Sequence, residues 1–155
     1  MTENEELVRT TIRSGDATLC AVAEGALLYQ LTGRGIGALL TAVEEERAVS
    51  HGSLDWGDKL VGRAAALLFT LVRPRSVFAL TMSTGAQDVL RTAGIPFACD
   101  AVIGDVLNRM GTGPCPMEAA VSDVEEPLVA FATLKKVCQA LSDAGRNDAS
   151  GKGNT

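Results

Sequence analysis

The chain has 155 residues, of which 46% are hydrophobic, and a formal net charge of -5. This length predicts one domain with a substantial core, because two separate cores would each be small. The acidic balance and the lack of clustered Lys and Arg argue against a nucleic-acid surface and against an anionic membrane surface. The longest apolar run, residues 64–72, is too short to cross a bilayer, and the N-terminus does not resemble a secretory signal, so we expect a cytoplasmic protein.

The first part of the chain predicts a helix, a hairpin and a second helix. Residues 3–13 carry apolar side chains near helical spacing and end at Gly15. Two apolar runs, 17–23 and 26–31, flank a Glu-Gly pair that is typical of a tight hairpin turn. Three glycines then lead into a helix over 36–47. Its last turn carries acids at 44–46, which oppose the helix dipole, so we expect that end to be exposed and frayed.

The remaining elements alternate between helices and strands. A polar loop over 49–57 precedes a helix from Lys59 to Val72, which is apolar nearly all round and is therefore expected to be buried, with Asp58 as its N-cap. The later predicted elements are a strand at 76–82, a helix at 84–93 closed by Gly94, a strand at 96–102, a helical turn at 105–110, and helices at 116–122 and 126–141.

This order predicts the fold class and the domain limits. A hairpin followed by strand–helix–strand units gives an α/β protein with a mixed sheet of four to five strands and helices on both faces. We assign residues 1–141 to a single domain. Residues 142–155 lack large apolar side chains, so we expect a disordered tail there.

Two candidate features precede the predicted buried helix. The segment TGRGIG at 32–37 enters a helix but lacks the spacing of a dinucleotide fingerprint or a P-loop, so a tight turn explains it best. Arg34 and Gly35 are still candidates for contact with a ligand. His51 is the only histidine and has no partner nearby in the sequence, so we do not expect it to be catalytic.

The third feature is Cys115, which lies between two prolines. With Pro116 at the first helical position, Cys115 falls at the N-cap and Glu118 at the third position, the pattern of a capping box. A thiol at a helix N-terminus can also be reactive. Cys-x-x-Glu offers only two metal ligands, and no CxxC is present, so we expect neither a metal site nor a disulfide framework.

Two blocks, DKLVGRAAALLF at 58–69 and NRMGTGPCPME at 108–118, carry a resemblance to a known family. The chain resembles small bacterial and archaeal proteins of uncharacterised function with a cytidine-deaminase-like fold, a three-layer α-β-α sandwich. The resemblance covers about residues 5–135. It implies that Asp58, Lys59 and Gly62 lie around the cleft where true deaminases bind a base, beside a loop that bears Asn108, Arg109, Gly113, Cys115 and Glu118.

Deaminase activity is not part of what the resemblance implies. Zinc deaminases need a His- or Cys-x-Glu on the helix after the hairpin and a Pro-Cys-x-x-Cys on the next helix. We assign DKLVG to the first position and STGAQD, which follows the strand at 76–82, to the second. Neither sequence supplies the ligands, so we expect no zinc and no other cofactor.

These residues leave three functions open. The first is a metal-independent enzyme that acts on a small polar metabolite, such as a nucleotide, with Cys115 as nucleophile or redox thiol. Lys59 and Arg109 would hold anionic groups. Asp58 or Glu118 would move protons. The second is a non-catalytic module that senses or stores the same ligand, and the third is an interaction protein with a vestigial cleft. The expected partner is a small molecule, and the apolar content leaves room for a homodimer.

Overall fold

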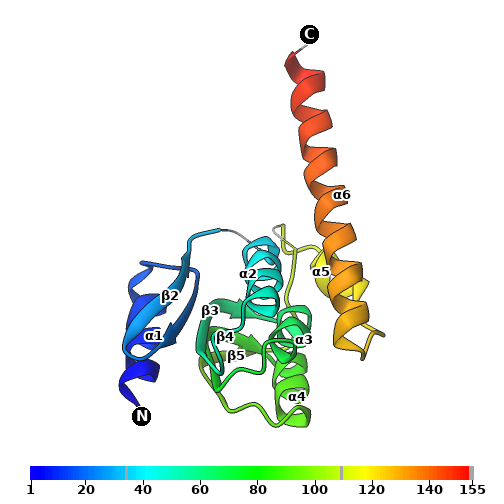
Figure 1. Ribbon diagram of the computed structural model, residues 1–155. Helices are drawn as coiled ribbons and strands as arrows, with labels where there is room; N and C mark the ends of the chain where they lie inside the picture. Colours follow the sequence, from blue (N-terminus) through cyan, green and yellow to red (C-terminus); the bar gives the residue numbers. More distant parts are fainter. Residues whose placement is uncertain (34, 109, 154–155) are drawn as a thin grey trace.

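The protein is described by a computed structural model that covers residues 1–33, 35–108 and 110–153, with side chains up to residue 144. Figure 1 shows the arrangement of its helices and strands. The elements are α1 (Glu3–Ser14), β1 (Leu19–Ala23), β2 (Ala26–Leu31), α2 (Gly37–Ala48), β3 (Asp55–Val61), α3 (Arg63–Thr70), β4 (Ser76–Ser83), α4 (Thr84–Thr92), β5 (Phe97–Ile103), α5 (Pro116–Ala120) and α6 (Pro127–Gly153).

The strands form one mixed five-stranded sheet in the order β2-β1-β3-β4-β5. β1 pairs antiparallel with β2 and with β3, whereas β3, β4 and β5 run parallel to one another. The predicted α/β class and mixed sheet are therefore confirmed. Because the three parallel strands end at the same edge, the loops that follow them gather there.

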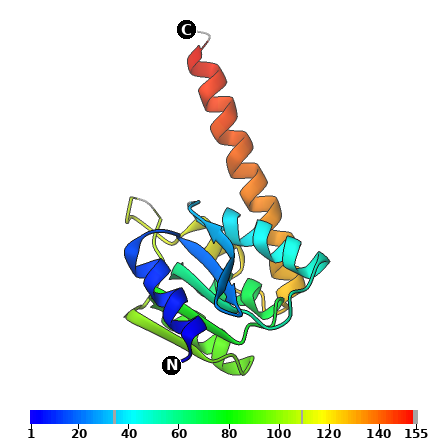
Figure 2. The same ribbon diagram turned by 60° about the vertical axis from the view of Figure 1, so that its left-hand side comes forward.

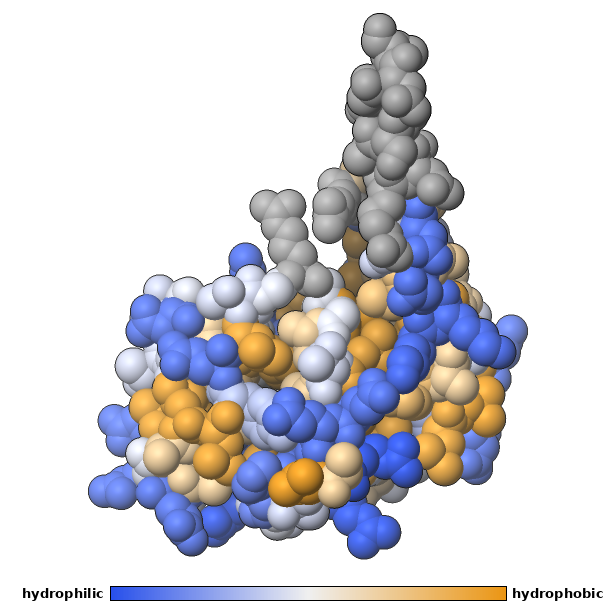
Figure 3. All heavy atoms as spheres, turned by 45° about the horizontal axis from the view of Figure 1, so that its top comes forward, coloured by the Kyte–Doolittle hydropathy of each residue, from blue (hydrophilic) through white to orange (hydrophobic). Residues whose placement is uncertain are grey.

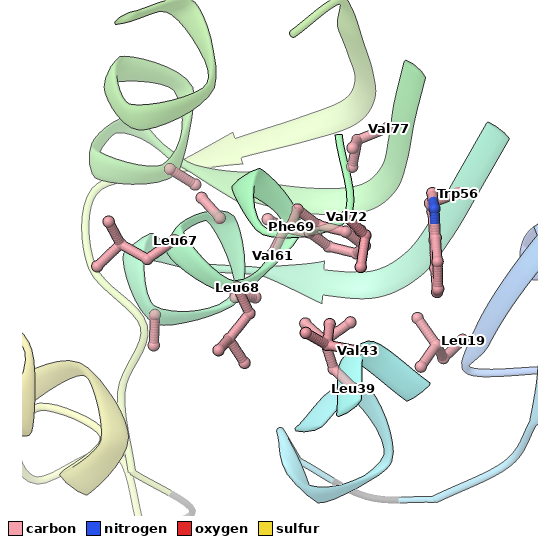
Figure 4. Packing of buried hydrophobic residues seen from close by; sticks show 14 of the residues in the cluster. Leu19, Leu39, Val43, Trp56, Val61, Leu67, Leu68, Phe69, Val72 and Val77 are labelled. Atoms are coloured by element: carbon pink, nitrogen blue, oxygen red, sulfur yellow. The ribbon is translucent and has the colours of Figure 1, made fainter. Parts of the chain in front are cut away.

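The two faces of the sheet are covered differently. α1 packs on one face, against β1, β3 and β4. It comes close because Gly57 of β3 has no side chain, and a Cβ there would meet Val8 and Ile12 of α1. The larger hydrophobic cluster lies on the other face, where α2 and α3 cover Trp56 and its neighbours. Figure 4 shows Trp56, Phe69 and the aliphatic side chains of this cluster.

α3 is the buried helix that the sequence predicts, but it begins later than expected. Its residues from Ala64 to Phe69 are all buried. Residues 59–61 belong instead to β3, which pairs with β1 on one side and with β4 on the other. Asp58 is consequently a residue within a central strand, and the prediction that it caps a helix is wrong.

Several other expectations can be compared with the structure. The hairpin is confirmed, with positive φ at Glu24 (51°) and Gly25 (78°). α4 is confirmed, and Ser83 Oγ caps it by accepting a hydrogen bond from the Ala86 N–H at 3.1 Å. The helical turn at 105–110 is wrong for the described residues, because this segment forms a loop in which Leu107 bridges to Pro114.

α6 forms an outer layer and then leaves the domain. Its first turns pack against α3, α5 and α2, with Ala130 and Leu134 fully buried and an ion pair of 3.0 Å between Lys135 and Glu44 of α2. Figures 1 and 2 both show the second half of α6 projecting beyond the other elements. We predicted the end of this helix at 141, and α6 continues to Gly153. The expectation of a disordered tail stays a prediction.

The described surface carries hydrophobic side chains in separate patches. Figure 3, seen from the side on which α6 projects, shows these patches with hydrophilic residues between them. Large exposed apolar residues include Leu60, Val102, Leu107 and Met110 near the ends of the parallel strands. In the part of the chain that the structure describes, we find no helix with the length and apolarity needed to cross a membrane.

Candidate functional site

The amino end of α3 is capped by a side chain from a distant part of the chain. The first N–H groups of a helix need acceptors from outside the helix, and the N-cap residue Gly62 has no side chain to supply one. Both carboxylate oxygens of Glu118, on α5, accept from the Ala64 N–H at 3.3 Å. The carboxylate fills the space that a Cβ on Gly62 would need. Gly62 and Glu118, both predicted site residues, are thus in contact.

Arg63, in the first turn of α3, bonds to the segment that follows α5. Its Nε donates to the carbonyl oxygen of Val121 at 3.2 Å, and its Nη2 donates to that of Val124 at 2.5 Å. The start of α3 and the segment after α5 are therefore joined by two side chains that cross between them. Arg63 is not among the residues predicted from the sequence, because its partners are backbone carbonyls that no local pattern reveals.

Burial makes the Glu118 carboxyl group easier to protonate. Its loss of solvent raises the pKa, and the N–H groups of Ala64 and Arg63 and the guanidinium charge of Arg63 offset part of that rise. The charge of Asp105 adds a smaller increase. A carboxyl group in this setting can exchange a proton closer to neutral pH than an exposed glutamate does.

The Glu118 cap can be tested with a double-mutant cycle. Glu118→Ala should cost about 1–2 kcal/mol in the free energy of unfolding, because it leaves an Ala64 N–H without its acceptor. Gly62→Ala should cost about 1–3 kcal/mol, because the new methyl group overlaps the carboxylate and Val106. Chemical denaturation should show that the double variant loses less than the sum of the two.

Glu118→Gln is the matched control for this cycle. It keeps a side-chain oxygen that can accept from the Ala64 N–H, so it should lose less stability than Glu118→Ala. Strict additivity of Gly62→Ala and Glu118→Ala would show that the two positions do not meet.

Asp58 is the second carboxyl group with a shifted proton affinity. It lies opposite Leu19 of β1 and Ala79 of β4, which are both buried in the larger core cluster, so its side chain is on that face of the sheet. Burial raises its pKa to about 7, although N–H groups of Leu60 and Lys59 favour the charged form. At neutral pH this group is partly protonated, and it can therefore both donate and accept a proton.

The loop before α5 is held mainly by its own backbone. The Cys115 N–H donates to the Val106 carbonyl at 3.0 Å, and the Asn108 N–H donates to the Gly113 carbonyl at 2.9 Å. The Asn108 side chain bonds to the backbone and hydroxyl of Thr112 at 3.1 and 3.2 Å. These contacts give Asn108 and Gly113 a role in shaping the loop that presents Cys115.

The predicted capping box at α5 is wrong. Cys115 is at the N-cap position, as expected, but its side chain makes no capping hydrogen bond. Glu118 is turned towards α3 and does not reach back to Cys115. Of the four cysteines, Cys20 is the most buried, and burial together with the charge of Asp58 raises its pKa to about 12, whereas Cys115 is only partly buried.

The remaining predicted residues do not join this group. Neighbouring strand residues point to opposite faces, so Lys59, which is exposed, diverges from Asp58. Asp58 and Gly62 are four residues apart along the chain, about 13 Å at strand spacing, so a ligand would have to bridge them. Gly35 lies just before α2 with a φ of 67° and open space around it. Residues 34 and 109, the predicted ligand-binding arginines, lie outside the described residues.

Two further features bear on the chemistry of this region. Among the described residues, no three or more His, Cys, Asp or Glu side chains are grouped so that they could hold a metal ion. A shallow surface hollow lies elsewhere, between α1 and the start of β4 and β5, where Arg9, Ser76 and Phe97 are among its lining residues. None of the predicted site residues lines that hollow.

Comparison with known proteins gives a family but no activity. The family model TM1506, domain of unknown function (DUF1893), matches residues 7–138. A crystal structure of a DUF1893 family protein (TM1506) from Thermotoga maritima has a similar fold, with a TM-score of 0.76 and 22% sequence identity. The alignment covers 88% of this chain and 90% of that chain. No curated protein matches the chain.

Proposed function

The chain belongs to the DUF1893 family of domains of unknown function, and we propose that it binds a small polar metabolite, such as a nucleotide, between Asp58 and the start of α5, where Cys115 and Glu118 lie. In this proposal Asp58 and Glu118 exchange protons with the ligand, and Cys115 is the nucleophile. The proposal leaves out Lys59, whose side chain points away from Asp58.

The observation that carries this proposal is a pair of half-buried carboxyl groups, Asp58 in the middle of β3 and Glu118 at the carboxyl end of that strand. Ligands of α/β proteins commonly bind at that edge of parallel strands. Asp58, with a pKa of about 7, and Glu118, with a raised pKa, are suited to proton transfer at neutral pH. Both are placed by fixed elements, Asp58 by a central strand and Glu118 by its bonds to α3.

The order of helices and strands supports a deaminase-like fold, which is part of the proposal. The same order shows that we matched the two zinc-ligand motifs of deaminases to the wrong segments of this chain. We matched DKLVG to the first motif position, which belongs on the helix after the hairpin. That helix is α2, which begins at Gly37, and the next helix is α3, which follows DKLVG. The first turn of α3 reads Arg63-Ala-Ala-Ala and has no cysteine. The Glu118 carboxylate is bound there instead.

Ligand binding can be tested on the full chain by thermal-shift and calorimetric titration with nucleobases, nucleosides and nucleoside monophosphates. Asp58→Asn should weaken binding about tenfold, the effect of losing one charged hydrogen bond. Lys59→Met is the matched control, because it changes the adjacent residue on the opposite face and should leave the affinity unchanged. Equal affinities of the wild type and Asp58→Asn for every ligand that binds would contradict the proposal.

A non-catalytic binding module is the alternative, and Cys115→Ser separates it from an enzyme. For an enzyme with a thiol nucleophile, the variant should bind the ligand but no longer consume it. If the wild type binds without consumption and Cys115→Ser has the same affinity, the binding module is the correct function. The partial burial of Cys115 favours the enzyme, because a nucleophile has to be reachable.

A further inference from the structure

A second group of polar side chains lies away from the proposed site, where α2 ends and β3 begins. Glu46, near the end of α2, is buried with 3% of its surface exposed. We predicted that the three acids at this end would be exposed, and for Glu46 this is wrong. A buried carboxylate needs hydrogen-bond donors to offset its lost hydration. Among the described residues, the hydrogen bonds to the Glu46 carboxylate all come from His51.

The contact between the two side chains is short and has a definite direction. His51 Nδ1 lies 2.5 Å from Glu46 Oε1, and the His51 backbone N–H donates to the same oxygen at 3.1 Å. An ionised carboxylate can only accept, and we therefore assign the proton of the neutral ring to Nδ1. In the neutral ring, Nε2 is then the nitrogen with a free electron pair. This is the arrangement by which a carboxylate orients a histidine in catalytic triads.

His51 is also open to solvent, unlike its partner. Its side chain is 41% exposed, and the hydrogen bonds that the structure gives its ring involve Nδ1 alone. The imidazole and the Tyr29 ring pack edge to face, with centroids 6.4 Å apart and planes at 82°. Tyr29 in turn stacks on Trp56 at 5.4 Å. The imidazole therefore has a fixed rotation, and the side chain is open to solvent.

The same corner holds polar atoms that the described residues do not satisfy. Three buried side-chain nitrogen or oxygen atoms among them lack a hydrogen-bond partner, and two of these are Tyr29 Oη and Trp56 Nε1. Buried groups of this kind are uncommon in folded proteins, and each one needs an explanation, such as a bound water, an ion or a catalytic role. The Tyr29 ring that carries the orphaned hydroxyl contacts the oriented histidine, and Trp56 stacks behind it.

We propose that His51, activated by Glu46, is the nucleophile of a second site that takes small neutral carbonyl compounds such as esters and anhydrides. The electrostatic surroundings favour a neutral compound, because the negative charges of Glu46 and Glu45 both act on the neighbouring Tyr29 and would repel an anion. In the reaction, Nε2 attacks the carbonyl carbon, and the bond from that carbon to the leaving oxygen breaks with its electron pair. The Nδ1 proton passes to Glu46 and then through solvent to the leaving group. The product is an Nε2-acyl imidazole.

The experiment uses diethyl pyrocarbonate, itself a neutral acyl donor, on the full chain without added histidines. Because His51 is the only histidine, peptide mass spectrometry assigns the ethoxycarbonyl group to it without ambiguity. The rate constant is taken at the alkaline plateau, where the imidazole is neutral, and compared with that of N-acetylhistidine methylamide. His51 should react at least about tenfold faster, a small part of what oriented acid–base groups can supply.

Two variants show whether Glu46 is the cause. Glu46→Gln should bring the rate of His51 down to that of the model compound. Glu44→Gln, on the same helix but exposed and paired with Lys135, should leave the rate unchanged. The fluorescence of Trp56, the only tryptophan, reports whether the corner stays folded in each variant. A wild-type rate no higher than that of the model compound, or an unchanged rate in a folded Glu46→Gln variant, would overturn the proposal.

Discussion

Replacing Asp58 with Asn is expected to make the protein more stable at pH 8 and to leave its stability nearly unchanged at pH 4.5. The pKa of Asp58 is about 7 in the folded protein and near 4 in an unfolded chain. The folded state therefore holds this proton more tightly, and its contribution to stability falls as the pH rises from about 4 to about 7. Allowing for partial solvent contact, we expect a loss of about 2 kcal/mol over this range.

The measurement is the free energy of unfolding in denaturant at several pH values for both proteins. Other carboxyl groups act in the opposite direction. The pKa of Asp100, for example, is lowered by its hydrogen bonds with Arg13, so its contribution is lost as the pH falls. The contribution of Asp58 is therefore given by the difference in the free energy of unfolding between wild type and Asp58→Asn at each pH. A difference that does not change between pH 4.5 and pH 8 would show that Asp58 titrates normally.

The second large effect on stability is expected when Gly57 is replaced. Alanine there would place its Cβ 2.5 Å from Val8 Cγ1 and 2.8 Å from Ile12 Cγ1. Both side chains are buried between α1 and the sheet, so α1 would have to move outwards. We expect Gly57→Ala to lower the free energy of unfolding by about 3 kcal/mol, the upper range for an overpacked core.

Two comparisons make the Gly57 result specific. Val8→Ala removes the methyl group that the new Cβ would touch, so the double variant should lose at least about 1 kcal/mol less than the sum of the single changes. Gly104→Ala is the control, because a Cβ there meets nothing within 4 Å, and it should change stability by no more than about 0.5 kcal/mol. Equal losses at Gly57 and Gly104 would mean that α1 does not pack closely on β3.

The most serious error of the sequence-based interpretation comes from the same strand. β3 reads DWGDKLV, and its charged residues and glycine are unusual in strands. These residues are explained only by their tertiary neighbours, since Gly57 makes room for α1 and Trp56 fills the opposite core. Elements whose signals are local, such as the hairpin turn at Glu24-Gly25 and the Ser83 cap, were predicted correctly.

In the candidate site, the sequence predicts only those positions that follow from neighbouring residues in the chain. Cys115 at the start of a helix follows from the prolines around it. The contact of Glu118 with Gly62 joins residues far apart in the chain, and the resemblance, not the pattern, placed the two near each other. The pairing of His51 with Glu46 had a usable signal, because the lone histidine follows the end of an acidic helix by only a few residues. We missed it by expecting all three acids to face solvent.

The length of α6 has a consequence for counting subunits. A helix of 27 residues is about 40 Å long, and much of it stands clear of the domain (Figure 2). An elongated particle diffuses more slowly than a sphere of equal mass. Gel filtration, which separates by hydrodynamic radius, will therefore make a monomer elute early and resemble a dimer. Light scattering measures mass directly and distinguishes the two.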